Sequence, residues 1–439
     1  MRRTPDIHLN LNVRGLRRSA TVSSAEQLSG LERAGKRVFR LGLGQSPFPV
    51  PEPVVEALRA AAPSKEYMPV CGHEPLREAI ANHLWRQQGV ERSAGDVLVG
   101  PGSKELMFLL QLVYYGDLVI PTPAWVSYAP QARVIGRRVV TLPTRAENDW
   151  KVTPGEFDPL CAEDPGRPRI VILNYPSNPT GATYRAEELR EIARVARRHR
   201  FVLLSDEIYG DLHHRGQHVS VARFYPEGTI VSNGISKWCG AGGWRLGAFI
   251  FPPDMRWLLE AMAAAASETY TSVAAPIQRA AVTAFAGGLW LEDYLAQSRR
   301  VLAVLGRHLR STLAEAGIGC TKPVGGFYLF PDFGEHREVL ASAGIHDSDT
   351  LCRRLLEDTG VGILPGVEFG RPGAELTARI AYVDFDGARA LEAARSVPRR
   401  TPLGRRFVER HAASMLEAVG RIAEWTLSLA GARSSLCVL

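Results

Sequence analysis

Cysteine is sparse in this sequence, and long apolar runs are missing. The six cysteines are scattered over 439 residues, with no C-x-x-C pair and no spacing typical of a metal site, which favours a reducing compartment over a disulfide scaffold. No apolar stretch follows the arginines of residues 1–6, so we expect no signal peptide. The most apolar helical stretch, 257–266, is too short to span a bilayer. These absences predict a cytoplasmic protein with no membrane segment and no metal site.

Two common nucleotide-binding motifs are also incomplete or absent. The glycine-rich loops at 100–105 and 240–245 both lack the last glycine of G-x-G-x-x-G, because Glu105 and Arg245 stand there, and G-x-x-x-x-G-K-[ST] does not occur. The sequence therefore lacks the main motif for binding a dinucleotide and the main motif for binding a nucleotide in a P-loop. The net charge of +7 is small for this length, and no basic tract with interleaved aromatics is present. We expect no nucleic-acid partner.

Short apolar runs alternate with helical segments from Asp96 onward. The runs that predict strands lie at 97–99, 118–120, 138–142, 170–173, 201–204, 229–231 and 247–251. This alternation predicts an α/β fold with a mostly parallel central sheet covered by helices on both faces. Beyond Asp254 the pattern is mainly helical, and a long helix from about 290 to 316 is expected to cross into a second lobe.

Three loops that follow predicted strands carry unusual residues. The loop 174–181 holds two asparagines, two prolines and a glycine, and 205–209 places a carboxylate and a phenol three residues apart. The stretch 232–247 sets Lys237 between a serine and a glycine-rich run. Loops at the carboxyl ends of parallel strands meet in one crevice, where a desolvated lysine can form a Schiff base. Taken alone, the same loops also fit a rigid turn, a helix cap and a surface lysine.

Two further signals are weaker. Gly102, Ser103 and Lys104 open a predicted helix directly after a strand, and free N–H groups at a helix start can bind an anion; alone, this loop is better explained as an ordinary strand–helix turn. The cluster His213, His214 and His218 suggests a metal, but its polar loop favours a solvated turn. Neither signal identifies a site without support from elsewhere in the chain.

The three loops, in this order and at these separations, resemble the signature blocks of the class I/II aminotransferases. These are fold type I enzymes that depend on pyridoxal-5′-phosphate (PLP), and the resemblance is to the aspartate-aminotransferase-like members. It covers about residues 40 to 395, nearly the whole chain. Its further blocks are 41–44, Tyr67 with Gly72, 100–104, 123–128, 325–328, 365–370 and 378–381.

The resemblance implies catalytic roles for Lys237, Asp206 and Tyr209. Lys237 would form the internal Schiff base with PLP and then move a proton between the substrate α-carbon and C4′. Asp206 would pair with the pyridine nitrogen and keep it protonated, so that the ring acts as an electron sink. Tyr209, together with Asn178, would hydrogen-bond the phenolic oxygen of the ring.

The resemblance also implies how cofactor and substrate are held. Trp125 would stack on the ring, Arg379 would fork onto the substrate α-carboxylate, and Tyr67 would reach the phosphate of a neighbouring subunit, which implies a homodimer. The implied cofactor-binding residues are Tyr67, Gly102, Ser103, Lys104, Trp125, Asn178, Asp206, Tyr209, Ser236, Lys237 and Arg245. The implied substrate-binding residues are Gly44, Trp125, Asn178 and Arg379. The phosphate ligands among them are Gly102, Ser103, Lys104, Ser236 and Arg245.

Pattern and resemblance together divide the chain into four predicted parts. Residues 1–50 form a polar arm and part of a small α+β domain built by both chain ends, and 51–300 form the large PLP-binding domain. Residues 301–397 complete the small domain, and 398–439 are a helical extension of it with a final helical region at 405–429. The chain departs from the family pattern in two places. Gly234 stands where a hydroxyl residue is common, and residues 238–242, which follow the lysine, are smaller than those common there.

Three functions fit these observations to different degrees. The first is a transaminase that passes an amino group from an L-amino acid to a 2-oxo acid. The second is a PLP-dependent lyase, a β/γ-replacement enzyme or a ring-forming enzyme with the same site. The third, a regulator with a fused DNA-binding module, is weak because about forty residues precede the first block. Arg379 accounts for an α-carboxylate, but no second basic residue is assigned to a substrate side chain.

Overall fold

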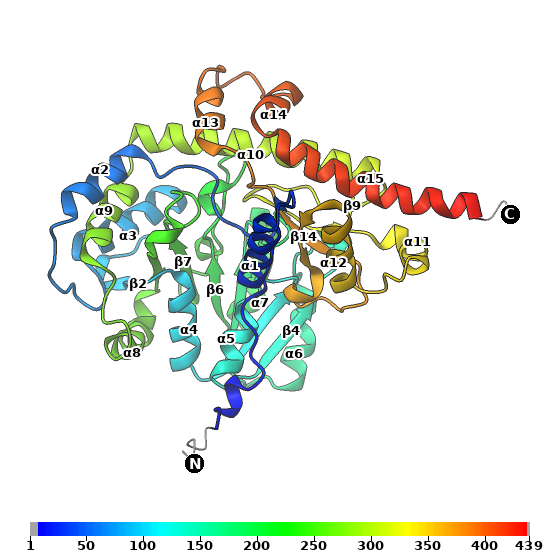
Figure 1. The fold of residues 1–439 in the computed structure, drawn as a ribbon. Helices are drawn as coiled ribbons and strands as arrows, with labels where there is room; N and C mark the ends of the chain where they lie inside the picture. Colours follow the sequence, from blue (N-terminus) through cyan, green and yellow to red (C-terminus); the bar gives the residue numbers. More distant parts are fainter. Residues whose placement is uncertain (1–7, 437–439) are drawn as a thin grey trace, which may run out of the picture.

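A seven-stranded sheet lies at the centre of the computed structural model, which describes residues 8–436 (Figure 1). The strand order is β2-β8-β7-β6-β5-β3-β4, and within this sheet β8 alone runs antiparallel to its neighbours. The strands are β2 (Val97–Gly100), β3 (Asp117–Thr122), β4 (Val139–Pro143), β5 (Arg169–Asn174), β6 (Val202–Asp206), β7 (Thr229–Gly234) and β8 (Gly247–Ile250). The prediction of an α/β fold with a mostly parallel sheet is confirmed.

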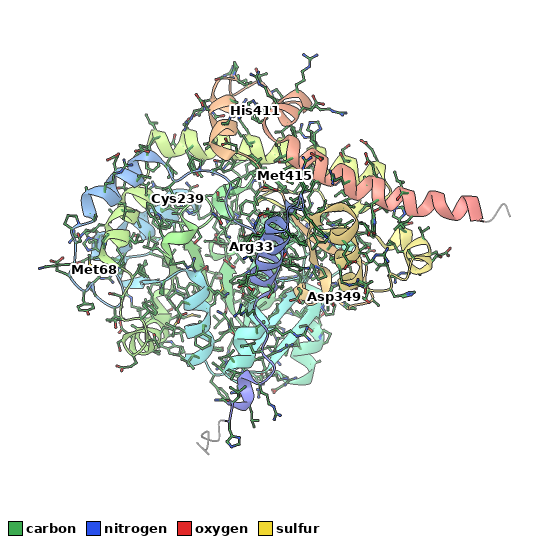
Figure 2. All side chains as sticks on the ribbon, in the orientation of Figure 1. Arg33, Met68, Cys239, Asp349, His411 and Met415 are labelled. Atoms are coloured by element: carbon green, nitrogen blue, oxygen red, sulfur yellow. The ribbon has the colours of Figure 1, made fainter. Side chains whose placement is uncertain are left out.

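Helices cover both faces of this sheet. They are α2 (Glu52–Ala61), α3 (Glu74–Gln88), α4 (Ser103–Val113), α5 (Tyr128–Val134), α6 (Asp158–Glu163), α7 (Ala186–Arg198), α8 (Arg256–Ser267) and α9 (Ala275–Ala286). Alternate residues of a strand face opposite sides, so Leu118 and Ile120 pack with α4, α5 and α8, whereas Val119 packs with α6 and α7. Side chains fill the space between the sheet and the helices (Figure 2).

Local sequence explains where these helices begin and end. Helix α3 has Pro75 in its first turn and ends where Gly89 takes a left-handed φ of 66°, a conformation that glycine adopts without strain. Helix α7 has two glutamates in its first turn and two arginines in its last. These charges complement the helix dipole at both ends.

The remaining elements form a smaller α+β region to which both ends of the chain contribute. The N-terminal strand β1 (Phe39–Arg40) pairs in parallel with β12 (Val361–Gly362), and an antiparallel sheet has the order β10-β14-β13. The other elements are α1 (Ala20–Arg33), α10 (Leu289–Glu315), β9 (Gly319–Cys320), β10 (Tyr328–Leu329), β11 (Pro331–Asp332), α11 (Arg337–Ser342), α12 (Ser348–Thr359), β13 (Leu364–Pro365), β14 (Ala378–Ala381), α13 (Gly387–Arg395), α14 (Arg405–His411) and α15 (Ala413–Leu436). The exact domain boundaries proposed from the sequence stay predictions.

Two helical segments differ from the sequence analysis. The polar arm contains α1, and the final helical region consists of two helices, α14 and α15, interrupted at Ala412. Arg300 of α10 fixes the preceding segment by donating hydrogen bonds to four backbone carbonyls within 394–401 at 2.8–3.1 Å. In Figure 1, α15 reaches beyond the body of the molecule. Within residues 8–436, no helix has both the length and the apolar character that crossing a membrane requires.

Candidate active site

A cavity of about 430 Å³ lies at the carboxyl ends of β5, β6 and β7, where ligands bind in sheets of this kind. The structure brings most of the predicted site residues to its wall. Those that line it are Gly44, Ser103, Lys104, Trp125, Asn178, Asp206, Tyr209, Ser236, Lys237, Arg245 and Arg379. Gly102 lies just behind this wall, at the start of α4, and Tyr67 lies away from it.

Lys237 is held inside the cavity by one hydrogen bond. Its Nζ donates to the carbonyl oxygen of Gly44 at 2.6 Å and lies 5.7 Å from the centroid of the Tyr209 ring. Burial, assisted by the positive charges of Arg379 and Arg245, lowers the pKa of Lys237 to about 8. At pH 7 about a tenth of this lysine is therefore the neutral amine, which is its nucleophilic form, whereas an ordinary lysine has almost none.

Asp206 ends β6, and its carboxylate is buried beside the same cavity. Its Oδ2 accepts a hydrogen bond from the Tyr128 hydroxyl at 2.5 Å, whereas its Oδ1 has no hydrogen-bond partner within residues 8–436. Burial raises the pKa of Asp206 to about 6, and the bond from Tyr128 opposes this rise. Leaving a buried carboxylate oxygen without a donor costs free energy. The arrangement therefore suits a ligand that brings its own donor.

Arg379 lies on β14 and is 1% exposed. Its Nη1 donates to the Oδ1 of Asn178 at 2.9 Å, and its Nη2 donates to the carbonyl of Gly42. Its Nε has no partner among the described residues. The rings of Tyr328 and Phe369 lie 4.8 and 5.0 Å from its guanidinium carbon. The guanidinium is thus fixed beside the cavity with donor capacity left over, which suits a carboxylate.

The start of α4 provides the other cationic end of the cavity. Gly102 caps the helix with a φ of 88°, and a β-carbon at this position would collide with the Arg245 guanidinium. Arg245 is held by donating to the Gly242 carbonyl at 2.9 Å. Burial and the nearby Arg245 lower the pKa of Lys104, which is the second residue of α4. A helix start with two cations beside it suits a phosphate.

Two predicted aromatic residues lie in different surroundings. Trp125 lines the cavity, with the Lys104 ammonium 5.6 Å from its ring centroid and the Tyr128 ring packed edge-on at 5.2 Å. Tyr67 is 91% exposed and lies outside the cavity wall. Within one chain, Trp125 can therefore contact a ligand in the cavity and Tyr67 cannot.

Thr21, Tyr128 and Tyr328 are among the cavity residues that had no role in the sequence analysis. Both tyrosines stand in blocks that carry the family resemblance, at 123–128 and 325–328, so the signal was present but unassigned. Thr21 lies on α1, a helix with one buried residue and therefore almost no apolar pattern. Nothing in the sequence marks that helix as part of the cavity wall.

The interpretation of residues 213–218 as a solvated loop holds for Arg215, Gly216 and Gln217, which are exposed, but it is wrong for His213. His213 is buried and accepts backbone hydrogen bonds at 3.2 Å, and burial lowers its pKa to about 4. His214 is hydrogen-bonded to the carbonyl of Gly326 at 3.0 Å, and His218 to the carboxylate of Glu207 at 2.9 Å. His213 and His214 are held in this way because the loop pairs with the segment that precedes β10. Among residues 8–436, no three His, Cys, Asp or Glu side chains are grouped to hold a metal ion.

The structure gives a physical reason for the first departure from the family pattern and places the residues of the second. A β-carbon at Gly234 would lie 2.8 Å from the carbonyl oxygen of Leu246 and 3.0 Å from the Cα of Gly247, so a hydroxyl side chain does not fit there. Trp238 is fully buried, stacks on the His83 ring at 5.9 Å and does not line the cavity. Trp238 therefore fills the core, whereas Gly242, the last residue of the second departure, lines the cavity.

Comparisons with known proteins agree with this geometry. A family model described as aminotransferase class I and II matches residues 36–394. An aspartate aminotransferase of Geobacillus stearothermophilus is 34% identical over 380 residues, which cover 84% of this chain and 93% of that protein. An aspartate/prephenate aminotransferase of Thermus thermophilus is 32% identical over 370 residues, or 83% and 92% of the two chains. The solved aspartate aminotransferase of Rhizobium meliloti superposes with a TM-score of 0.80 at 26% identity, covering 96% of this chain and 99% of that one.

The chain therefore belongs to the aminotransferase class I and II family, in which a fold type I sheet carries a PLP site at its carboxyl edge. Within this family it is aspartate-aminotransferase-like in sequence and in fold. It is a PLP-dependent transaminase, as the sequence analysis predicted.

Proposed function

We propose that amino transfer between an L-amino acid and a 2-oxo acid takes place in the cavity that holds Lys237. One observation carries the proposal: a lysine amine with a pKa of about 8 and a buried carboxylate oxygen without a partner line the same cavity. PLP chemistry requires this pair, an amine that bonds the aldehyde and an anion that keeps the ring nitrogen protonated.

The residues around the cavity fit the cofactor. Ser236, Arg245 and the start of α4 would hold its phosphate, and Trp125 would pack against its ring. Oδ1 of Asp206 would accept a hydrogen bond from the protonated ring nitrogen, and Nζ of Lys237 would hold the aldehyde carbon covalently. When bound, PLP withdraws electrons from the substrate α-carbon and makes the proton on that carbon acidic.

Arg379 and Lys237 would act on the substrate itself. Arg379 would bind the α-carboxylate with its unpartnered Nε and its fixed guanidinium plane. Binding at this point orients the α-carbon, which decides which of its substituents faces the lysine. Nζ of Lys237, as the neutral amine, would take the α-proton and later return it.

The catalytic assignment is tested by Lys237→Ala. The variant should lose amino transfer, and after borohydride treatment and unfolding its cofactor should separate from the protein, because no bond to lysine is present to be reduced to a stable covalent link; the native enzyme should retain its cofactor. Lys36→Ala is a matched control, since Lys36 is exposed and lies outside the cavity wall. Appreciable turnover by Lys237→Ala would refute the assignment.

The names of the relatives suggest the substrate. Several are called aspartate aminotransferase, one asparagine–oxo-acid transaminase and one aromatic aminotransferase. We propose aspartate as the first amino donor to examine and 2-oxoglutarate as its partner. Absorbance titration of the holoenzyme with single amino acids distinguishes the candidate donors, because only a true amino donor removes the absorbance of the lysine-bound cofactor. A response to aromatic amino acids and none to aspartate would refute the choice.

We further propose a cytoplasmic homodimer in which Tyr67 completes the neighbouring site. An isolated tyrosine that is 91% exposed suits a subunit contact, and the described cysteines are free, as in a reducing compartment. Mixing unfolded Lys237→Ala and Tyr67→Phe chains and refolding them tests the shared site. A hybrid dimer has one site with both native residues, so activity should exceed that of either variant alone. Activity equal to the average of the two parents would refute the sharing.

A further inference from the structure

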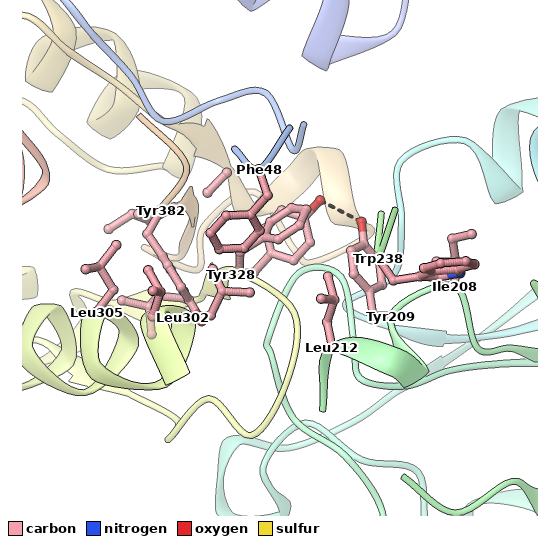
Figure 3. Close-up of a cluster of buried hydrophobic side chains, with 14 of the residues drawn as sticks. Phe48, Ile208, Tyr209, Leu212, Trp238, Leu302, Leu305, Tyr328 and Tyr382 are labelled. Atoms are coloured by element: carbon pink, nitrogen blue, oxygen red, sulfur yellow. Dashed lines mark hydrogen bonds between the residues drawn. The ribbon is translucent and has the colours of Figure 1, made fainter. Parts of the chain in front are cut away.

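The hydroxyls of two buried tyrosines meet beside the cavity. The Tyr209 and Tyr328 oxygens are 2.7 Å apart, and the two rings pack edge-on with centroids 5.5 Å apart (Figure 3). Tyr209 follows β6 and Tyr328 lies on β10, so the bond joins the central sheet to the smaller α+β region. Tyr209 and Tyr328 are 3% and 1% exposed. Water therefore does not compete for this hydrogen bond.

Tyr328 also contacts the carboxylate-binding arginine. Its strand β10 pairs with β14, which carries Arg379, and Tyr328 lies opposite Ala381. This pairing places the Tyr328 ring 4.8 Å from the guanidinium carbon. An aromatic face at this distance attracts a cation, and more strongly where water is excluded. The ring and the hydroxyl of Tyr328 therefore contact two different functional groups.

The Tyr328 hydroxyl reaches the anchor of Lys237 as well. It lies so close to Gly44 that a β-carbon there would collide with it. The carbonyl of Gly44 is the group that accepts the hydrogen bond of Lys237. The Tyr328 side chain thus contacts Tyr209 and Arg379, and it lies beside the Gly44 backbone that holds Lys237.

We propose that Tyr328 is a positioning residue that directs the Tyr209 hydroxyl toward the cofactor and, with its ring, fixes Arg379. The inference rests on the proposed function and on the role that the family resemblance implies for Tyr209, a hydrogen bond to the phenolic oxygen of PLP. A phenol that donates its own hydrogen can still accept one. Tyr328 then becomes the donor to Tyr209, and hydrogen bonds in such a chain strengthen one another.

Both phenols keep their hydrogens under the conditions of the reaction. Burial raises the pKa of Tyr209 well above its usual value. Burial also raises the pKa of Tyr328, although the Arg379 charge opposes the rise. Two hydroxyl hydrogens are thus available for two bonds: one between the tyrosines and one from Tyr209 into the cavity. The other titratable side chains on the cavity wall are Lys104, Tyr128, Asp206, Lys237, Arg245 and Arg379.

The test is an absorbance titration of the holoenzyme, which reports the pKa of the lysine-bound cofactor without any turnover. A donor to the phenolic oxygen stabilises its deprotonated form, so Tyr209→Phe should raise that pKa. Tyr328→Phe keeps the ring and removes the hydroxyl, and should raise it by a smaller amount, a few tenths of a pH unit. The double variant should match Tyr209→Phe alone, because Tyr328 acts through Tyr209. Tyr382→Phe is the control: Tyr382 is also fully buried and donates to Gly326 at 3.3 Å, outside the cavity wall.

The contact with Arg379 has its own measurement. Tyr328→Leu removes the ring and should weaken binding of the amino-acid donor several-fold, while Tyr328→Phe should leave that affinity unchanged. The inference would be overturned if the pKa of the lysine-bound cofactor were shifted in Tyr209→Phe but were the same in Tyr328→Phe as in the native enzyme. That result would leave the proposed function intact. No shift in Tyr209→Phe would instead refute the role of Tyr209 itself.

Discussion

The cofactor-free enzyme should be stabilised by removing the charge of Asp206. Burial raises the pKa of this carboxyl from 3.8 to about 6, so the native state favours the protonated form more than the unfolded chain does. The stability that this difference confers is present below pH 3.8 and is lost as the pH rises through 6. At 1.36 kcal/mol per pH unit, the ionised group costs about 3 kcal/mol at pH 8 and roughly half of that at pH 5. We therefore expect apo Asp206→Asn to unfold at higher urea concentration than apo native enzyme at pH 8.

The assay is urea unfolding of both apo proteins at pH 5 and pH 8, followed by circular dichroism. The advantage of Asp206→Asn should shrink by about half at pH 5. Asp211 is the matched control, because it is equally buried but pairs with His83 at 3.1 Å, which helps to lower its pKa. Asp211→Asn should therefore destabilise the protein at pH 8. An Asp206→Asn variant that is less stable than the native apo enzyme at pH 8 would refute the reasoning.

Three further results are expected. Arg379→Lys should raise the KM for the amino donor at least about tenfold and leave the cofactor absorbance unchanged, because lysine lacks the planar fork; an unchanged KM contradicts the carboxylate role. Gly234→Ser should lower the free energy of unfolding by about 1–3 kcal/mol without tightening cofactor binding, since its β-carbon would lie 2.8 Å from the carbonyl oxygen of Leu246; thermal unfolding checks this, and tighter binding contradicts it. The rate at which PLP bonds to the apo enzyme should rise with pH through an apparent pKa near 8, that of Lys237; a midpoint near 10.5 would show an ordinary exposed lysine.

The sequence predicts the central sheet well because most of its strands are buried on both faces. Val97–Gly100 and Gly247–Ile250 are buried at every position, so their composition alone marks them as interior strands. Helix α1 was missed for the opposite reason: Leu28 is its one buried residue, and little apolar pattern remains to detect. The two-residue strands of the smaller region, such as β10, are too short to show any period.

Eleven of the twenty residues that line the cavity could be named from the sequence, but their mutual contacts could not. Tyr128 lies 78 residues before Asp206, and Gly44 lies 193 residues before Lys237. Such pairs are set by which strands become neighbours, and local pattern carries no information about that. The burial of His213 could not be predicted for the same reason, because its bridge partner Gly325 lies in the segment before β10.

The pKa shifts of the titratable groups in the cavity have one main cause, and binding of a single ligand would oppose several of them. Burial is the largest influence on Lys104, Lys237 and Asp206, and it drives each toward its neutral form. A phosphate at the start of α4 would favour the charged form of Lys104, and a protonated ring nitrogen would favour the charged form of Asp206. Since the cations and the carboxylate line one cavity, a ligand that is anionic at one end and cationic at the other satisfies both at once. The charges of the cavity are therefore suited to a dipolar ligand.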